Sequence, residues 1–383
     1  WWDQSVVAGV EIVWIDLTDR SNPYFVHSKR TAGNYLSARR VDQEVLLVSQ
    51  TNLRWPQEWN TELDLSAPFS YDKNMAVLDD HHIADMLPKA TVTSYEEETT
   101  ELVVNGESVG TEKDYQAIQC EDIYASDKGN ATNIAYFQIF SVDNPEKDTK
   151  ATGIVSSWNH LYASTDNAYM VNTEFHDGGY YTPGFRVSQV HKFATFQGNG
   201  AVDYKASGVF TGSVHNQFSM SEQDSLFRVV VTENPGAAND GWGNWNSGEG
   251  NETSLLVFEE DNAELLEIAR VEDIGHDEVV QSVRFIGDRA YVVTYPMSTS
   301  QREEIPNVTN IWDPLFVIDF DDPRNPKLRG ELEVPGFSTY IHPLGDDYLL
   351  TVGENTDSNN RITIEDFQNN MNTLLSDQQK TFF

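Results

Sequence analysis

The residues best suited to bind an ion lie near the C-terminus, at positions 355–366. Counted as a twelve-residue loop, this stretch has oxygen-bearing side chains at its first, third and fifth positions and a carboxylate at its last. The calcium loop has this pattern, and its seventh position contributes a backbone carbonyl. The candidate calcium ligands are therefore Asn355, Asp357, Asn359, Arg361 through its carbonyl, and Asp366.

Three positions of this loop depart from the usual calcium pattern. Asn355 stands where Asp is usual, Asn360 where Gly is usual, and Asp366 is shorter than the usual Glu. Asn tolerates a left-handed backbone, so the turn at Asn360 stays possible. The alternative is an acidic hairpin without a metal. A segment compatible with a helix follows at residues 365–375.

A second candidate site is the tryptophan-rich run at residues 241–248. Trp242 and Trp245 alternate there with Gly and Asn. Exposed indoles stack on sugar rings, and neighbouring amides bond sugar hydroxyls, so these two residues are candidate carbohydrate ligands. The alternative is a loop tip whose indoles pack on the adjacent part of the fold.

Histidines are the other candidate metal ligands. The run Asp79, Asp80, His81, His82 places two carboxylates beside two imidazoles, but neighbouring side chains on a strand point to opposite faces, which favours a surface loop. Four more histidines are spread along the chain, and if they met in a central channel they could hold a metal: His160, His191, His215 and His342.

The sequence offers little for covalent catalysis. It has no Gly-x-Ser-x-Gly elbow and no phosphate-binding glycine loop. Its one cysteine, Cys120, lies between Gln119 and Glu121 and lacks the basic neighbours that lower a thiol pKa. A single cysteine also excludes a disulfide within the chain.

Charge excludes one class of partner. The chain has 61 acidic and 25 basic residues, a formal net charge of −36. A field of this sign repels nucleic acid and anionic membranes, so we expect neither as a partner. No apolar run reaches the length of a transmembrane helix. The acidity suits a surface solvated in salty water or one that holds cations.

The elements that must position these residues are repeated. Each repeat has an apolar strand, an acidic turn often closed by proline, a second strand, and two further strands. A unit of roughly 35 to 45 residues with four strands is typical of a β-propeller blade. Five copies are clear, at residues 12–50, 136–173, 190–232, 255–295 and 315–353.

We therefore predict an all-β fold, a β-propeller of four-stranded antiparallel blades. The five clear repeats lie within residues 1–353, with an irregular insertion or divergent blade at about residues 51–133, and six to eight blades are expected in the intact ring. A polar C-terminal segment, residues 354–383, follows with the candidate calcium loop and short helix.

Several segments carry a family resemblance, clearest at residues 282–294, 313–319 and 335–343. They resemble the secreted bacterial and archaeal proteins that have a C-terminal β-propeller domain, distantly similar to WD40 repeats. The resemblance implies an exported propeller without an assigned reaction, and it supplies no catalytic residues.

Three functions remain open from the sequence. The first is a secreted or cell-surface binding or assembly module, stabilised by cations such as calcium, whose partner is a protein, another copy of itself, or a carbohydrate. The second is an extracellular metal-dependent hydrolase or lyase with its site at the central channel. The third is a structural subunit of an extracellular filament or layer.

Overall fold

The computed structural model confirms the all-β prediction. It describes residues 9–53, 75–76, 79–80, 82–96, 99–100, 103–104, 107–125, 133–147, 149–157, 159–176, 185–197, 200–233, 237–239, 245–247, 251–275, 278–296, 312–335, 337–345 and 348–354. Nearly all of these residues lie in strands or the turns between them. The chain divides into two compact units, Trp1–Ala168 with Lys192–Lys205, and Tyr169–His191 with Ala206–Phe383.

Unit 1 contains two antiparallel sheets. The first has the strand order β1-β2-β5-β8, and its strands are β1 (Gly9–Asp16), β2 (Tyr24–Ala32), β5 (Lys89–Ser94) and β8 (Thr111–Gln116). The second has the order β3-β4-β10-β11, with a parallel fifth strand on β11; its strands are β3 (Asn34–Val41), β4 (Glu44–Asn52), β10 (Asn133–Ser141), β11 (Ala151–Ser156) and β9 (Ile123–Ala125).

The region expected to be irregular adds strands to both of these sheets. Strands β5 and β8 widen the first sheet, and β9 widens the second. The same region also holds four short elements: α3 (Ile83–Met86), η1 (Cys120–Asp122), and the paired strands β6 (Val103–Val104) and β7 (Glu107–Ser108).

The next sheet carries the chain from one unit into the other. It has nine strands in the order β12-β13-β14-β15-β22-β21-β18-β16, with β17 beside β18. Its first four strands are β12 (Asn159–Ala163), β13 (Asn167–His176), β14 (Phe185–Ala194) and β15 (Asp203–Thr211), and one parallel residue pair, Ser207 with Glu264, joins β15 to β22. The division between the units falls inside β13, β14 and β15.

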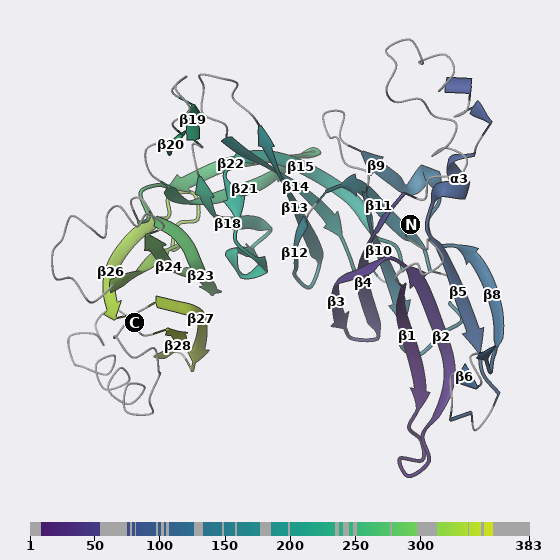
Figure 1. The fold of residues 1–383 in the computed structure, drawn as a ribbon. Helices are drawn as coiled ribbons and strands as arrows, with labels where there is room; N and C mark the ends of the chain where they lie inside the picture. The colour runs from purple at the N-terminus through teal and green to yellow at the C-terminus, as the bar shows by residue number, and fades with distance from the viewer. Residues whose placement is uncertain are drawn as a thin grey trace. The chain divides into compact units, whose positions relative to one another are not determined.

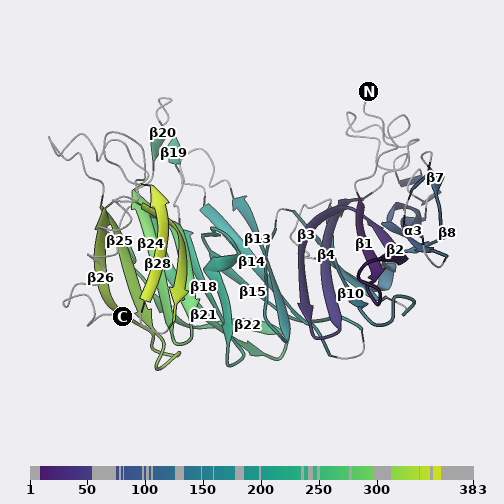
Figure 2. The same cartoon turned by 90° about the horizontal axis from the view of Figure 1, so that it is seen from below.

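Unit 2 continues with four more groups of strands. A meander is formed by β17 (Met220–Gln223), β18 (Leu226–Glu233), β21 (Glu252–Asp261) and β22 (Glu264–Val271), with β16 (Ser213–Val214) beside β18. A second meander is formed by β23 (Glu278–Ile286), β24 (Arg289–Pro296), β25 (Trp312–Asp319) and β26 (Lys327–Pro335). Two hairpins complete the unit, β27 (Phe337–Leu344) with β28 (Tyr348–Glu354), and β19 (Ala237–Asn239) with β20 (Trp245–Ser247). Figures 1 and 2 show the strands of the second meander side by side.

The sequence repeats are offset from the sheets by half a unit. In the fourth repeat, β21 and β22 close one sheet, whereas β23 and β24 open the next. The first, second and fifth repeats divide in the same way, two strands to each sheet, whereas the strands of the third repeat all belong to the nine-stranded sheet. The acidic turn therefore joins two strands of one sheet, and the chain crosses to the next sheet in the middle of the repeat.

The recurring acidic turns are hairpin devices, as their composition predicts. Asp16 Oδ1 accepts a hydrogen bond from the Thr18 backbone N–H at 2.7 Å, and Asp319 Oδ1 accepts one from Asp321 at 2.7 Å. The bond from Thr18 also holds the pKa of the exposed Asp16 carboxyl below its usual value, because it favours the charged form. These carboxylates thus stabilise the turn after the first strand of the repeat.

Glycine occupies two crossings of the chain, one between the two sheets of unit 1 and one within the nine-stranded sheet. Gly33, between β2 and β3, has φ of 111°, and Gly212, between β15 and β16, has φ of 95°. A Cβ atom at Gly33 would lie 2.7 Å from the carbonyl oxygen of Gln50, and one at Gly212 would lie 2.9 Å from that of Thr232. Both crossings therefore need a residue without a side chain.

The core lies between adjacent sheets. In unit 2, Val230 and Leu255 of one meander belong to the same buried cluster as Val292, Phe316 and Ile318 of the next. These runs have Val, Ile, Leu or Phe at nearly every position because both faces of an inner strand are covered. These buried inner strands hold the more exposed first strand of each sheet in place.

Candidate functional site

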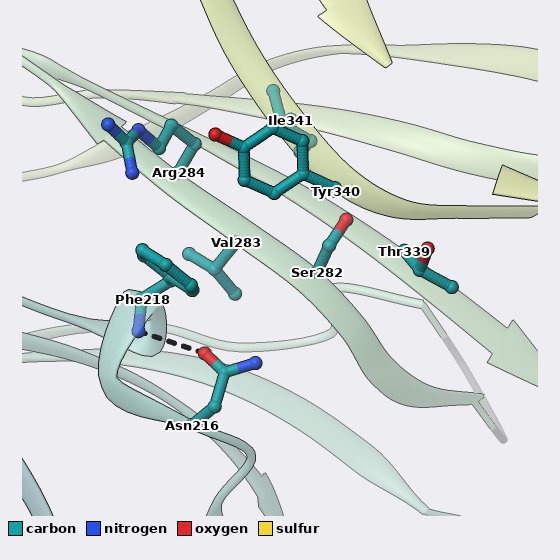
Figure 3. A pocket seen from close by; sticks show the side chains of 8 residues that line it. All are labelled: Asn216, Phe218, Ser282, Val283, Arg284, Thr339, Tyr340 and Ile341. Atoms are coloured by element: carbon teal, nitrogen blue, oxygen red, sulfur yellow. Dashed lines mark hydrogen bonds between the residues drawn. The ribbon is translucent and has the colours of Figure 1, made fainter. Parts of the chain in front are cut away.

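A shallow hollow in unit 2 combines exposed aromatic rings with an arginine. It encloses about 230 Å3, including space open to solvent. Three elements form it: η2 (Gln217–Ser219), which precedes β17, and the strands β23 and β27. Each strand is the first of its sheet. Figure 3 shows the eight lining residues, which are Asn216, Phe218, Ser282, Val283, Arg284, Thr339, Tyr340 and Ile341.

Matching irregularities in two strands aim side chains at the hollow. The pairing of β23 with β24 shifts just before Ser282, and the pairing of β27 with β28 shifts just before Tyr340. Such bulges redirect side chains. Counted from the bulge, Arg284 of β23 and His342 of β27 hold equivalent positions. In unit 1, β3 has a bulge at the same place, and its equivalent residue is Arg39.

The aromatic residues of the hollow form a connected set. The guanidinium of Arg284 lies over the Phe218 ring, 5.6 Å from its centroid. Phe218 meets Tyr340 edge-on, with centroids 6.4 Å apart, and Tyr340 stacks on His342 at 6.1 Å. The Tyr340 hydroxyl and His342 Nδ1 lie 3.1 Å apart. The rings are thus held in defined orientations although Phe218 and Tyr340 are 39% and 41% exposed.

The hydroxyl groups of the hollow are used by the fold. Ser282 Oγ donates to the carbonyl of Ser338 at 2.8 Å, which ties β23 to β27, and Thr339 Oγ1 donates to the carbonyl of Val352 at 3.2 Å. Asn216 Oδ1 accepts the Phe218 backbone N–H at 2.8 Å and caps η2, as Figure 3 shows. This cap fixes the backbone that carries the Phe218 ring.

Arg284 differs from Arg270 and Arg324 of the same unit in its charge partners. Arg270 pairs with Glu233 at 3.2 Å and Glu267 at 2.8 Å, and Arg324 pairs with Glu259 at 2.6 Å. Among the residues that the structure describes, no carboxylate lies within ion-pair distance of Arg284. Its half-buried guanidinium is therefore available to a ligand with acceptor oxygens.

Most of the predicted site residues fall outside the described part of the chain. This holds for the whole calcium loop, including Asn355, Asp357, Asn359, Arg361 and Asp366, and for Trp242. Trp245 lies on β20, where it pairs with Asn239. The calcium and tryptophan sites therefore stay predictions.

The histidines lie on separate elements. His160 is on β12, His191 on β14, His215 follows β16, and His342 is on β27. Within the described ranges, no group of three or more His, Cys, Asp or Glu side chains is placed to hold a metal ion. Burial lowers the pKa of His191 to about 4, so this side chain is neutral at physiological pH.

Sequence reasoning missed Phe218, Arg284 and Tyr340 as site residues. Arg284 and Tyr340 lie in segments that carried the family resemblance, but no motif marks any of the three. The available signal was positional: Arg284 and Tyr340 belong to the first strands of successive sheets, and Phe218 belongs to the turn before β17.

The arrangement of strands agrees with a comparison to protein families. The family model described as a beta propeller domain matches residues 3–376. This chain belongs to the beta propeller domain family. No helix that the structure describes in this propeller chain has the length and apolar character needed to cross a membrane.

The curated relatives of this propeller are archaeal. An uncharacterized protein of Methanocaldococcus jannaschii is 31% identical over 158 residues, 41% of this chain and 21% of the relative. An uncharacterized protein of Archaeoglobus fulgidus is 32% identical over 142 residues, 37% of this chain and 18% of the relative. The aligned parts thus span about a fifth of each relative.

The comparison with solved structures gives weak alignments. A variant of the Synechocystis apocarotenoid oxygenase aligns with a TM-score of 0.32 and 9% identity, covering 71% of this chain and 54% of that chain. A second variant of the same enzyme aligns with a TM-score of 0.33 and 7% identity over the same shares of the two chains.

Proposed function

We propose that this propeller is a non-catalytic binding module and that the hollow of unit 2 holds its ligand. The observation that carries the proposal is the grouping of two exposed rings, Phe218 and Tyr340, with Arg284, which has no carboxylate partner among the described residues. Aromatic residues and arginine are the types that dominate binding sites. In a surface that is otherwise strongly acidic, this grouping is distinctive.

The fold supports a role in binding because it makes the hollow rigid. Each lining strand is hydrogen-bonded to a neighbour, and Ile341 belongs to a buried cluster with Tyr291, Val293 and Leu315 of the preceding sheet. A preformed site loses little conformational entropy when a ligand binds. The same proposal includes four-stranded blades, six to eight in the intact ring, which present such first strands repeatedly.

The proposal also places the protein outside the cell, either secreted or at the cell surface, with calcium as a stabilising ion. The acidic composition and the loop at residues 355–366 support this part. If calcium binds the native state, the thermal midpoint falls when a chelator removes the ion. The double variant Asp357→Asn, Asp366→Asn is then insensitive to the chelator, whereas the matched variant Asp321→Asn, Asp322→Asn in a hairpin turn responds like the native chain. Equal midpoints with calcium and with chelator would contradict calcium binding.

Binding through the hollow is tested with immobilised glycans. We expect the native chain to be retained on a subset of them and the double variant Phe218→Ser, Tyr340→Ser to lose that retention with its unfolding free energy unchanged. The control is Leu266→Ser, Leu328→Ser, which removes apolar side chains that are 43% and 42% exposed elsewhere. A native chain that binds none of the glycans, or a Phe218, Tyr340 variant that binds as well as the native chain, contradicts the proposal.

A further inference from the structure

We infer that the hollow recognises a carboxylate carried on a single sugar ring, that is, one uronic acid residue of a glycan. This inference rests on the proposed function and names the class of its ligand. Its two parts are the charge of Arg284 and the rings of Phe218 and Tyr340.

The charge argument begins with the shortage of cations. The chain has 61 acidic side chains for 25 basic ones, so an arginine near the surface has abundant carboxylates to pair with. Arg270 and Arg324 make such pairs, yet Arg284 faces an aromatic ring. A planar guanidinium that is backed by a ring presents its donors edge-on, and this fork matches the two oxygens of a carboxylate.

In unit 1 the arginine at the equivalent position makes a hydrogen bond within the fold. Arg39 holds the same place after the bulge of β3, and its Nη1 donates to the carbonyl of Ala163. Arg284 has no such acceptor in the described part of the chain, because Phe218 lies beside it instead. The difference leaves the donors of Arg284 for an external group.

The rings supply the second half of the recognition. Tyr340 is fixed by His342, and its hydroxyl points toward the Arg284 side chain in Figure 3. A sugar ring laid on an exposed aromatic face buries its C–H groups and keeps its hydroxyls in water. A uronic acid brings both features together, since its carboxylate is attached to the same ring that stacks.

The test compares two sugars that differ only in the carboxylate. Methyl β-D-glucuronide and methyl β-D-glucoside are titrated into the native chain by calorimetry at 0.15 M salt, where distant charges are screened. We expect the glucuronide to bind at least about tenfold more tightly, since hydrogen bonds to charged groups contribute about that factor. Acetate, which has the charge but no ring, is expected to bind more weakly than the glucuronide.

Variants separate the two parts of the site. Arg284→Gln is expected to reduce glucuronide affinity to that of the glucoside, Arg284→Lys to restore part of the difference, and Tyr340→Ala to weaken both sugars. The matched control is Arg289→Gln, which removes the same charge from an exposed position on β24 outside the hollow.

The outcomes distinguish this inference from the proposed function. If both sugars bind equally and Tyr340→Ala abolishes their binding, the hollow is a binding site but does not recognise the carboxylate. If acetate binds as tightly as the glucuronide, the hollow does not recognise the sugar ring. If none of the three binds, the inference fails, and retention on other glycans through Phe218 and Tyr340 then decides the proposed function separately.

Discussion

Two arginines of unit 2 use the same chemistry for opposite purposes. Arg228 is 3% exposed, and its guanidinium lies 5.0 Å from the centroid of Phe285 and 4.8 Å from that of Phe320. Arg284 is half-buried and lies over one ring, the exposed ring of Phe218. Phe285 and Arg284 are neighbours on β23, so the strand carries one arginine–aromatic contact on each face.

The difference between the two lies in their hydrogen bonds. Arg228 donates to the Gly287 carbonyl at 3.1 Å, to Ser221 Oγ at 2.9 Å and to Gln223 Oε1 at 3.1 Å, so both terminal nitrogens of its guanidinium are used within the fold. Arg284 contacts the ring of Phe218 but has no comparable hydrogen-bond acceptors among the described residues. A cation–π contact alone therefore does not mark a binding site; what marks it is the combination of exposure and unused donors.

The largest effect is expected at Arg228. Replacing it with Met keeps the length of the side chain but leaves the buried Ser221 Oγ and two partly buried acceptors without a donor, so we expect a loss of about 3 kcal/mol in the free energy of unfolding. Arg284→Gln is expected to change that free energy by less than about 0.5 kcal/mol. Urea denaturation of both variants measures the difference. Similar losses in the two variants would break the comparison.

A buried histidine, His191, is expected to make the stability of the protein depend on pH. The pKa of His191 is lowered to about 4 by burial, and that of an unfolded histidine is about 6.5. The unfolded state therefore binds the proton first as the pH falls, so the stability present above pH 6.5 decreases down to pH 4, by at most about 3 kcal/mol.

Urea denaturation at pH 7 and pH 4.5 measures this loss for the native chain. In His191→Gln the part of the pH dependence due to this residue disappears. A His191→Gln variant with an unaltered slope would show that other groups set the acid sensitivity.

A smaller effect is expected at a buried tyrosine of unit 1. Tyr136 is fully buried, and its hydroxyl lies 2.8 Å from Thr31 Oγ1 and donates to the carbonyl of Ala32. Tyr136→Phe leaves both partners buried, and we expect a loss of about 1 to 2 kcal/mol at pH 7.

Burial also raises the pKa of Tyr136 to about 12, above its unfolded value near 10. The unfolded state loses its proton first as the pH rises, so the native chain loses stability between about pH 10 and pH 12. Tyr136→Phe removes this part of the alkaline decrease. Denaturation of both chains at pH 7 and at pH 10.5 tests both effects, and parallel losses in the two chains would exclude Tyr136 as the cause.

The smallest effect on stability is expected at Tyr340. Its hydroxyl and His342 Nδ1 form an exposed hydrogen bond, so Tyr340→Phe should change the free energy of unfolding by less than about 0.5 kcal/mol. The freed ring should nevertheless weaken sugar binding, because its orientation is no longer fixed. Calorimetric titration with methyl β-D-glucuronide detects this. A large loss of stability would mean that the hollow is part of the core.

The fold could be read from the sequence in considerable detail. Strands such as β24 and β18 are short β-branched runs bounded by turn residues, and the acidic turns recur in the predicted places. The offset between repeat and sheet was not predicted, because the same four strands fit one sheet or two halves of neighbouring sheets. Only the pairing of β23 with β24 and not with β22 decides between them.

The sequence by itself determined the family, the hairpin turns and the strong negative charge, because these depend on composition and on residues close together along the chain. Tertiary structure decided which side chains meet. Phe218, Arg284 and Tyr340 are separated by more than fifty residues each and lie together because η2 and the first strands of two consecutive sheets, β23 and β27, meet at the hollow. The hollow therefore arises from packing between sheets, and local sequence patterns carry no record of it.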